Sequence, residues 1–140
     1  MNSTISFSPS AIICSGLFVP RDSQILYIED RQGNRETIDN PVDKIINLPM
    51  VALINKGTAS GAEIMAGIFR VILNTPLIGE TTFGKGVVQQ IFPLSHQGGV
   101  IFTISKYYLP DGTDINGKGI QPDIVVEKEE EQIDIAIQEL

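Results

Sequence analysis

The chain has 140 residues, 42% of them hydrophobic, which is the size and composition of one globular domain. Its formal net charge is −7, and the last fourteen residues contribute most of it because they hold six acids and one lysine. Since no basic patch is present, the composition argues against partners such as nucleic acid or an anionic membrane. The single cysteine, Cys14, and the single histidine, His96, exclude an internal disulfide and a zinc cluster.

Residues 1–10 are polar and show no periodic pattern, so we assign no element to them. The apolar run at 11–20 predicts a short helix over 11–18. This run is ten residues long, too short to span a bilayer, and no lysine or arginine precedes it as in a signal peptide. If the native protein is exported, we therefore expect its signal to lie outside this chain.

The next segments predict a hairpin and then a strand followed by a helix. Residues 24–38 read as two short strands around a Gly-Asn turn. Residues 50–55, MVALIN, form a continuous apolar run, which is typical of a strand covered on both faces in a parallel sheet. The helix that follows ends at the stop signal Asn74 and Pro76. Its apolar stripe is formed by Ile64, Ile68, Val71 and Ile72.

The second half of the chain predicts further strands and a terminal helix. The turns that separate them are expected at 95–99 and 110–112. Residues 128–140 predict an acidic C-terminal helix with one apolar stripe of Ile133, Ala136, Ile137 and Leu140. The expected strands lie at 76–80, 87–94, 100–109 and 123–126.

Residues 79–90, GETTFGKGVVQQ, come close to the phosphate-binding pattern G-x-x-x-x-G-K-[ST]. Gly86 replaces the hydroxyl residue that would ligate magnesium after Lys85, and a strand is predicted where that pattern requires a helix. This context argues against a nucleotide site. A lysine among apolar neighbours can instead serve as a general base, because shielding from water disfavours the charged form of an amine.

Ser60 is the best-placed nucleophile for such a base, because it lies at the junction of the buried strand and the helix. There its hydroxyl lies at the positive end of the helix, and the Gly61 amide points to where an oxyanion forms. A structural interpretation competes with this one, since Ser60 to Glu63 is S-x-x-E, a capping box. Spacing alone favours the cap for Ser60 and a solvated surface position for Lys85.

Three segments together resemble the protease core of the carboxy-terminal processing (tail-specific) proteases. They are LINKGTASGAEIMAG, LIGETTFGKGVVQQIFPL and ISKYYLPDGTDINGKGIQPDIVVE. The resemblance covers residues 11–127. It implies an α/β fold, namely a partial crotonase/ClpP-like core with a parallel sheet, flanking helices and a β-hairpin. It also implies a serine endopeptidase that uses no metal or cofactor, acts on protein C-terminal tails, and works in the bacterial periplasm, cell envelope or extracellular space.

The resemblance assigns roles to individual residues. Ser60 matches the family's nucleophile, Lys85 its general base, and Gln89 the glutamine that orients the lysine. In a continuous strand, Lys85 and Gln89 would point to one face, which would let the amide oxygen hold the amine. The Gly61 amide would contribute to the oxyanion hole. In this mechanism the serine attacks the peptide carbonyl, the lysine carries the proton to the leaving amine, and water resolves the acyl-enzyme.

The sequence also departs from the family. Family members carry, upstream of the part that aligns with 11–20, a strand and turn resembling L-D-L-R-x-N-P-G-G, whose glycine amide is a second oxyanion donor. This chain has no such segment and no peptide-binding PDZ domain. We therefore expect a weak or inactive protease, with an unpaired apolar sheet edge at 50–55 that favours homo-oligomers. The alternative is a non-catalytic relic that serves as a peptide-binding or assembly module.

Overall fold

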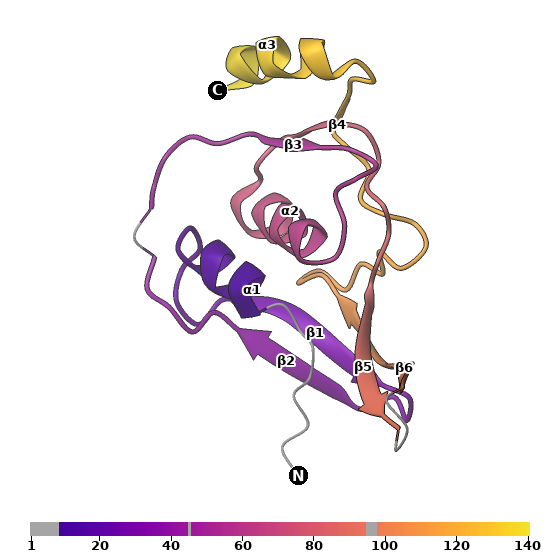
Figure 1. The fold of residues 1–140 in the computed structure, drawn as a ribbon. Helices are drawn as coiled ribbons and strands as arrows, with labels where there is room; N and C mark the ends of the chain where they lie inside the picture. The colour runs from indigo at the N-terminus through magenta and orange to yellow at the C-terminus, as the bar shows by residue number, and fades with distance from the viewer. Residues whose placement is uncertain (1–8, 45, 95–97) are drawn as a thin grey trace.

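The computed structural model describes residues 9–44, 46–94 and 98–140, and in it two sheets are combined with three helices (Figure 1). His96 and most of the expected polar start lie outside the described residues, as does the middle of the turn expected at 95–99. The elements in chain order are α1 (Pro9–Gly16), β1 (Gln24–Asp30), β2 (Arg35–Asp39), β3 (Ala52–Ile54), α2 (Gly61–Leu73), β4 (Leu77–Gly79), β5 (Val87–Pro93), β6 (Gly99–Tyr108), β7 (Ile124–Val125) and α3 (Glu129–Glu139).

The larger sheet is antiparallel, with the strand order β2-β1-β6-β5. The predicted hairpin forms its β1–β2 part, and Tyr27 of β1 lies opposite Tyr108 of β6. Because β6 is longer than β1, the far end of the β5–β6 pair extends beyond the rest of the sheet, at the lower right of Figure 1. There Ile91 and Ile101 lie opposite each other and are both exposed.

The smaller sheet is parallel, with the order β3-β4-β7, so the expected α/β fold with a parallel sheet is confirmed. The central strand β4 is covered on both faces: Leu77 packs in the cluster that includes α2, and Ile78 in the cluster that includes Ala136 of α3. The expectation that the strand at 50–55 is covered on both faces is wrong. The observed strand β3 is shorter than the predicted one and lies at the edge of the sheet. Although α3 lies nearby, Leu53 of β3 is 44% exposed.

The helix α2 forms as its periodicity predicts, and it lies between the two sheets (Figure 1). Ile64 and Ile68 are buried on the predicted stripe, in the core that also includes residues of α1 and both sheets. The helix ends where expected, with Asn74 in the left-handed conformation (φ 54°, ψ 33°) that closes many helices. The strand β3, the turn and this helix therefore fix the position of Ser60.

The acidic helix α3 forms, but its predicted apolar stripe does not face the core. Ala136 is buried, whereas Ile133, Ile137 and Leu140 are 58%, 64% and 63% exposed. The two buried residues of α3 are Ala136, which is on the predicted stripe, and Gln132, which is not. The Gln132 amide donates to the Val126 carbonyl at 2.9 Å, and the small alanine packs near β4. In the described parts of the chain, every helix is too short or too polar to cross a membrane.

Candidate active site

Ser60 occupies an unusual backbone conformation between β3 and α2. Its φ is 54° and its ψ is −116°, and it is the residue directly before the first turn of α2. Residues other than glycine rarely adopt a positive φ, so this conformation is strained. Such strain is often found at active sites, where a sharp turn from strand to helix presents a nucleophile. The hydroxyl of Ser60 is therefore held at the N-terminal end of α2.

The carboxylate of Glu63 is the centre of the hydrogen-bond network around Ser60. Glu63 is fully buried and is the third residue of α2, in the first turn of the helix. Its Oε2 accepts the amide of Ser60 at 2.9 Å and the amide of Lys85 at 2.9 Å. Its Oε1 accepts the Thr82 hydroxyl at 2.5 Å and the Gly84 amide at 2.7 Å. Four donors from two segments thus satisfy one buried carboxylate, as a buried charge requires.

The shared oxygen brings the two predicted catalytic segments together. Two bonds of 2.9 Å to one atom hold the amide nitrogens of Ser60 and Lys85 within about 6 Å of each other. The capping box predicted only that Glu63 would bind the start of its own helix. Its carboxylate also binds the loop that carries Lys85, and so it joins two parts of the chain that are distant in sequence.

Lys85 lies in the loop at 80–86, which we call the lysine loop, and its side chain is half-buried. A strand, β5, follows this loop, so the helix required by a phosphate-binding loop is not formed. The loop packs closely on residues 115–120: the Gly117 amide donates to the Gly84 carbonyl at 2.8 Å, and the Ile120 amide to the Thr82 hydroxyl at 2.7 Å. The backbone of Lys85 is thereby held from two sides.

Tyr107 of β6 contacts both segments. Its hydroxyl donates to the Lys85 carbonyl, and its amide donates to the Gly86 carbonyl at 3.1 Å. Its hydroxyl also shares a hydrogen bond with the Ser60 side chain. Burial and, next, the nearby charge of Glu63 raise the pKa of the Tyr107 phenol, against the smaller lowering effect of Ser60. The phenol is therefore neutral around neutral pH.

The structure does not bring every predicted site residue into contact. Gln89 lies on β5 with an exposed side chain, and Lys85 precedes that strand. The pairing of β5 with β6 also shifts register between Val88 and Gln89. The premise of a continuous strand from Lys85 to Gln89 is therefore wrong, since a loop and a bulge interrupt the alternation of side chains. No hydrogen bond joins Gln89 to Lys85 among the described residues.

Gly61 is the first residue of α2 and is half-buried, next to Ser60. Its amide belongs to the first turn of the helix, where amide groups have no partner within the helix and the helix dipole favours negative charge. The position of this amide is thus compatible with the predicted oxyanion donor. Among the described residues, no group of three or more His, Cys, Asp and Glu side chains could hold a metal ion.

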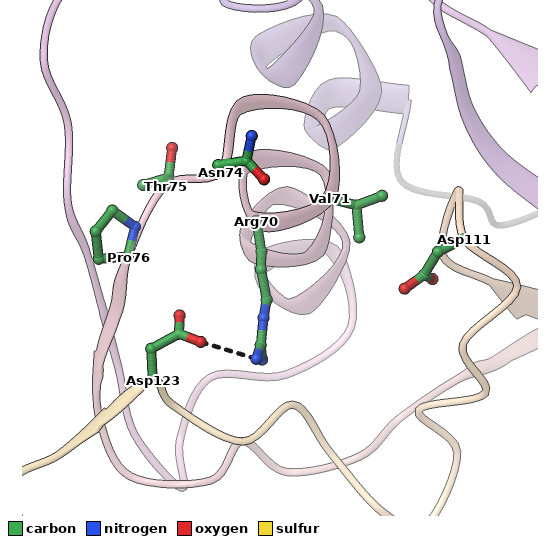
Figure 2. Close-up of a pocket in the computed structure, with 7 residues that line it drawn as sticks. All are labelled: Arg70, Val71, Asn74, Thr75, Pro76, Asp111 and Asp123. Atoms are coloured by element: carbon green, nitrogen blue, oxygen red, sulfur yellow. Dashed lines mark ion pairs between the residues drawn. The ribbon is translucent and has the colours of Figure 1, made fainter.

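A pocket lies at the other end of α2 from Ser60 (Figure 2). It has a volume of about 490 Å³. Figure 2 shows Arg70 extending from α2 toward Asp123, with which it forms an ion pair of 2.8 Å. Arg70 also donates to the Gln121 carbonyl at 2.7 Å, so both charged groups already have partners within the chain. This pocket is separate from the Ser60 region, and its polar residues serve to attach α2 to the segment before β7.

The model of Peptidase family S41 matches residues 7–126. The chain belongs to this family. A carboxyl-terminal-processing protease of Synechocystis sp. is 38% identical over 125 residues, which are 86% of this chain and 29% of that relative. The carboxy-terminal processing protease CtpA of Bacillus subtilis is 40% identical over 117 residues, which are 84% of this chain and 25% of that relative.

The S41 fold is also found by comparison with solved structures. The photosystem II D1 C-terminal processing protease has a TM-score of 0.74 to this chain at 35% sequence identity. The match covers 86% of this chain and 31% of that protease. The predicted resemblance to the C-terminal processing proteases is therefore confirmed. This S41 chain spans less than a third of the length of these relatives.

Sequence reasoning missed three residues of this site. Glu63 was interpreted only as part of a helix cap, and the buried Thr82 and Tyr107 were not considered. Thr82 carried a weak signal, as a hydroxyl residue inside the glycine-rich segment before Lys85. Tyr107 carried none, because an aromatic residue in an alternating strand is typical of ordinary sheet packing.

Proposed function

We propose that this chain carries the nucleophile and the general base of a C-terminal processing protease. In this proposal Ser60 is the nucleophile and Lys85 is the general base. The observation that carries it is the shared Oε2 of Glu63, which binds the amides of both residues at 2.9 Å. Membership of Peptidase family S41 and the protease relatives support the reaction class.

The reaction proceeds through an acyl-enzyme. The Ser60 oxygen bonds to the carbonyl carbon of the scissile peptide while its proton passes to the Lys85 amine. When the tetrahedral intermediate collapses, the carbon–nitrogen bond breaks and the lysine returns the proton to the leaving amine. Water then attacks the ester, Lys85 takes a proton from it, and the Ser60 hydroxyl is restored as the new carboxyl terminus leaves.

The negative charge that develops on the carbonyl oxygen needs fixed donors. We assign one donor to the Gly61 amide, which lies in the first turn of α2 beside Ser60. Gln89 remains a prediction as the residue that orients the lysine, and in this role its side chain must turn toward Lys85 when substrate binds. Both assignments follow the resemblance to the family.

The extent of the protease is also part of the proposal. We assign residues 11–127 to the C-terminal part of a protease core and 128–140 to an added acidic helix. A further strand beside β3 would supply a second oxyanion donor, so this chain alone is expected to be a weak protease or inactive. The substrates are the C-terminal tails of proteins, and the setting is the bacterial cell envelope or the extracellular space.

A serine-reactive fluorophosphonate tests the nucleophile and the base without needing the natural substrate. We expect the probe to label the chain at Ser60, as located by mass spectrometry of its peptides. Ser60→Ala should abolish labelling, and Lys85→Ala and Lys85→Arg should each reduce it strongly, since a guanidinium does not lose its proton at usable pH. Lys56→Arg, at an exposed position paired with Glu80, serves as the matched control.

Two outcomes would overturn the proposal. Labelling of the Lys85→Arg variant at the wild-type rate would exclude Lys85 as the base. A folded wild-type chain that does not react, even when a strand supplying the second oxyanion donor is added in a longer chain, would favour the non-catalytic relic. Circular dichroism and thermal unfolding of every variant establish that a loss of labelling is not a loss of fold.

A further inference from the structure

Tyr107 links the nucleophile to the base, and the mechanism above makes no use of its phenol. The residue lies in β6 and is 2% exposed. Its hydroxyl contacts the Lys85 carbonyl and the Ser60 side chain, while its amide binds Gly86 at 3.1 Å. Glu63 joins the same two segments through their amides, so Tyr107 provides a second connection between them.

The chemistry of these groups fixes the direction of each hydrogen bond. A carbonyl oxygen only accepts, so the single phenol proton of Tyr107 points to the Lys85 carbonyl. The phenol oxygen can then only accept from the Ser60 hydroxyl. The proton that catalysis must remove from Ser60 therefore points to Tyr107.

This direction is unproductive for the proposed reaction. A general base must lie within hydrogen-bond reach of the proton that it removes, at about 2.6–3.2 Å between heavy atoms. Across the part of the chain that the structure describes, no hydrogen bond joins the Ser60 hydroxyl to the Lys85 amine, although Glu63 holds the two backbones together. Because burial keeps the phenol protonated, Tyr107 continues to donate to Lys85 at neutral pH.

We propose that Tyr107 is a positioning residue that holds the Ser60 hydroxyl in a resting orientation, away from the Lys85 amine. This inference rests on the proposed function. Activation then requires the Ser60 hydroxyl and the Lys85 amine to turn toward each other, so that the hydrogen bond of the hydroxyl passes from the phenol to the amine. The two backbones stay in place, because Glu63 and the carbonyl contact of Tyr107 continue to hold them.

The direction of a rate change separates this role from simple structural support. Tyr107→Phe removes the acceptor of the Ser60 proton, so we expect the fluorophosphonate to label Ser60 about fivefold to tenfold faster than in the wild type, the effect of one hydrogen bond. Tyr108→Phe is the matched control, because the hydroxyl of Tyr108 binds Glu29 at 3.4 Å instead. It should leave the rate unchanged. A Tyr107→Phe rate equal to or below that of Tyr108→Phe, with both variants folded, would overturn the proposal.

A second measurement does not depend on reactivity. With tyrosine labelled at the phenol carbon, nuclear magnetic resonance of the 140-residue chain reports each phenol separately. Ser60→Ala should move the Tyr107 signal at neutral pH, because a donor to the phenol oxygen is lost, and should leave the signals of Tyr27 and Tyr108 unchanged. An unmoved Tyr107 signal would overturn the proposal. A moved signal supports the resting contact even if the probe labels no variant, a result that would count against the proposed function alone.

Discussion

The backbone amides of Ser60 and Lys85 donate to the same oxygen atom, Oε2 of the buried Glu63, each at 2.9 Å. The separation of the two backbones is therefore set by a third side chain and by the packing of the lysine loop, rather than by Ser60 and Lys85 themselves. Disturbing either support is expected to affect the pair while both of its side chains remain intact.

Replacing Glu63 with glutamine should destabilise the fold and the site together. A glutamine has the same shape, but its NH₂ group replaces one of the two oxygens that accept hydrogen bonds. Depending on its orientation, this group faces the amides of Ser60 and Lys85 or the Thr82 hydroxyl and the Gly84 amide, which are all donors. We expect unfolding to become easier by about 3 kcal/mol, since buried donors lose their acceptor. Urea denaturation measures the stability, and fluorophosphonate labelling of Ser60 reports the loss at the site.

Glu130→Gln on the surface of α3 is the control for this change, because it removes the same charge from an exposed position. Its effect on stability should be small, as for most surface substitutions. Equal stability of the Glu63→Gln and Glu130→Gln variants would show that Glu63 does not hold the two segments together.

A methyl group at Gly119 should displace the loop that supports Lys85. Gly119 has a φ of +71°, and a Cβ there would lie 2.3 Å from the carbonyl oxygen of Thr82. Gly117→Ala is a closely matched control, since Gly117 has a φ of +73° with open space around it. Alanine in this conformation costs about 1–2 kcal/mol at either position, and only Gly119→Ala adds the clash. We expect Gly119→Ala to lower the thermal midpoint further and to slow labelling of Ser60. Identical behaviour of the two variants would contradict this role of the 115–120 loop.

Much of the fold could be predicted from local sequence patterns. The stripe of Ile64 and Ile68 with a stop at Asn74 gave α2, and two short strands around a Gly-Asn turn gave the β1–β2 hairpin. Local patterns failed where the outcome depends on neighbouring elements. Residues 50–54 are all apolar, yet Leu53 is exposed because β3 lies at a sheet edge. In α3, Ile133, Ile137 and Leu140 are exposed, because Gln132 occupies a buried position and binds Val126.

The candidate site could be predicted only in part, for a related reason. The strand-to-helix junction and the glycine-flanked lysine indicated Ser60 and Lys85, and the resemblance to a protease family joined them. The contacts that hold them together come from residues distant in sequence, such as Glu63 with Gly84 and Tyr107 with Lys85. No spacing rule encodes such contacts, because they depend on how segments distant in sequence pair and pack in the fold.

The phenol of Tyr107 should make stability fall at alkaline pH. An unfolded tyrosine loses its proton near pH 10, whereas burial and the charge of Glu63 raise the pKa of Tyr107 in the folded chain. Because the unfolded state releases this proton first, the contribution of Tyr107 to the free energy of unfolding is complete below about pH 10. It decreases as the pH rises above that value. Urea denaturation between pH 8 and 11 should show this decline in full for the wild type and a much smaller decline for Tyr107→Phe. Tyr108→Phe also loses a phenol whose pKa is raised by burial, so its decline should lie between those of the other two proteins. Equal slopes in all three proteins would contradict the burial of a neutral phenol at this position.

The edge of β3 is expected to make the isolated chain associate. Among the described strands β3 pairs only with β4, and Leu53 on it is 44% exposed. A strand edge with free amide and carbonyl groups and an apolar side chain is a template for pairing with another chain. Leu53→Lys places a charge there, so we expect sedimentation velocity to show a shift toward monomer relative to the wild type. Val125→Lys on β7, the opposite edge, where Val125 is 71% exposed, is the matched control and should leave association unchanged. A wild-type chain that stays monomeric at every concentration would refute this expectation, and a shift caused only by Val125→Lys would assign the association to the other edge.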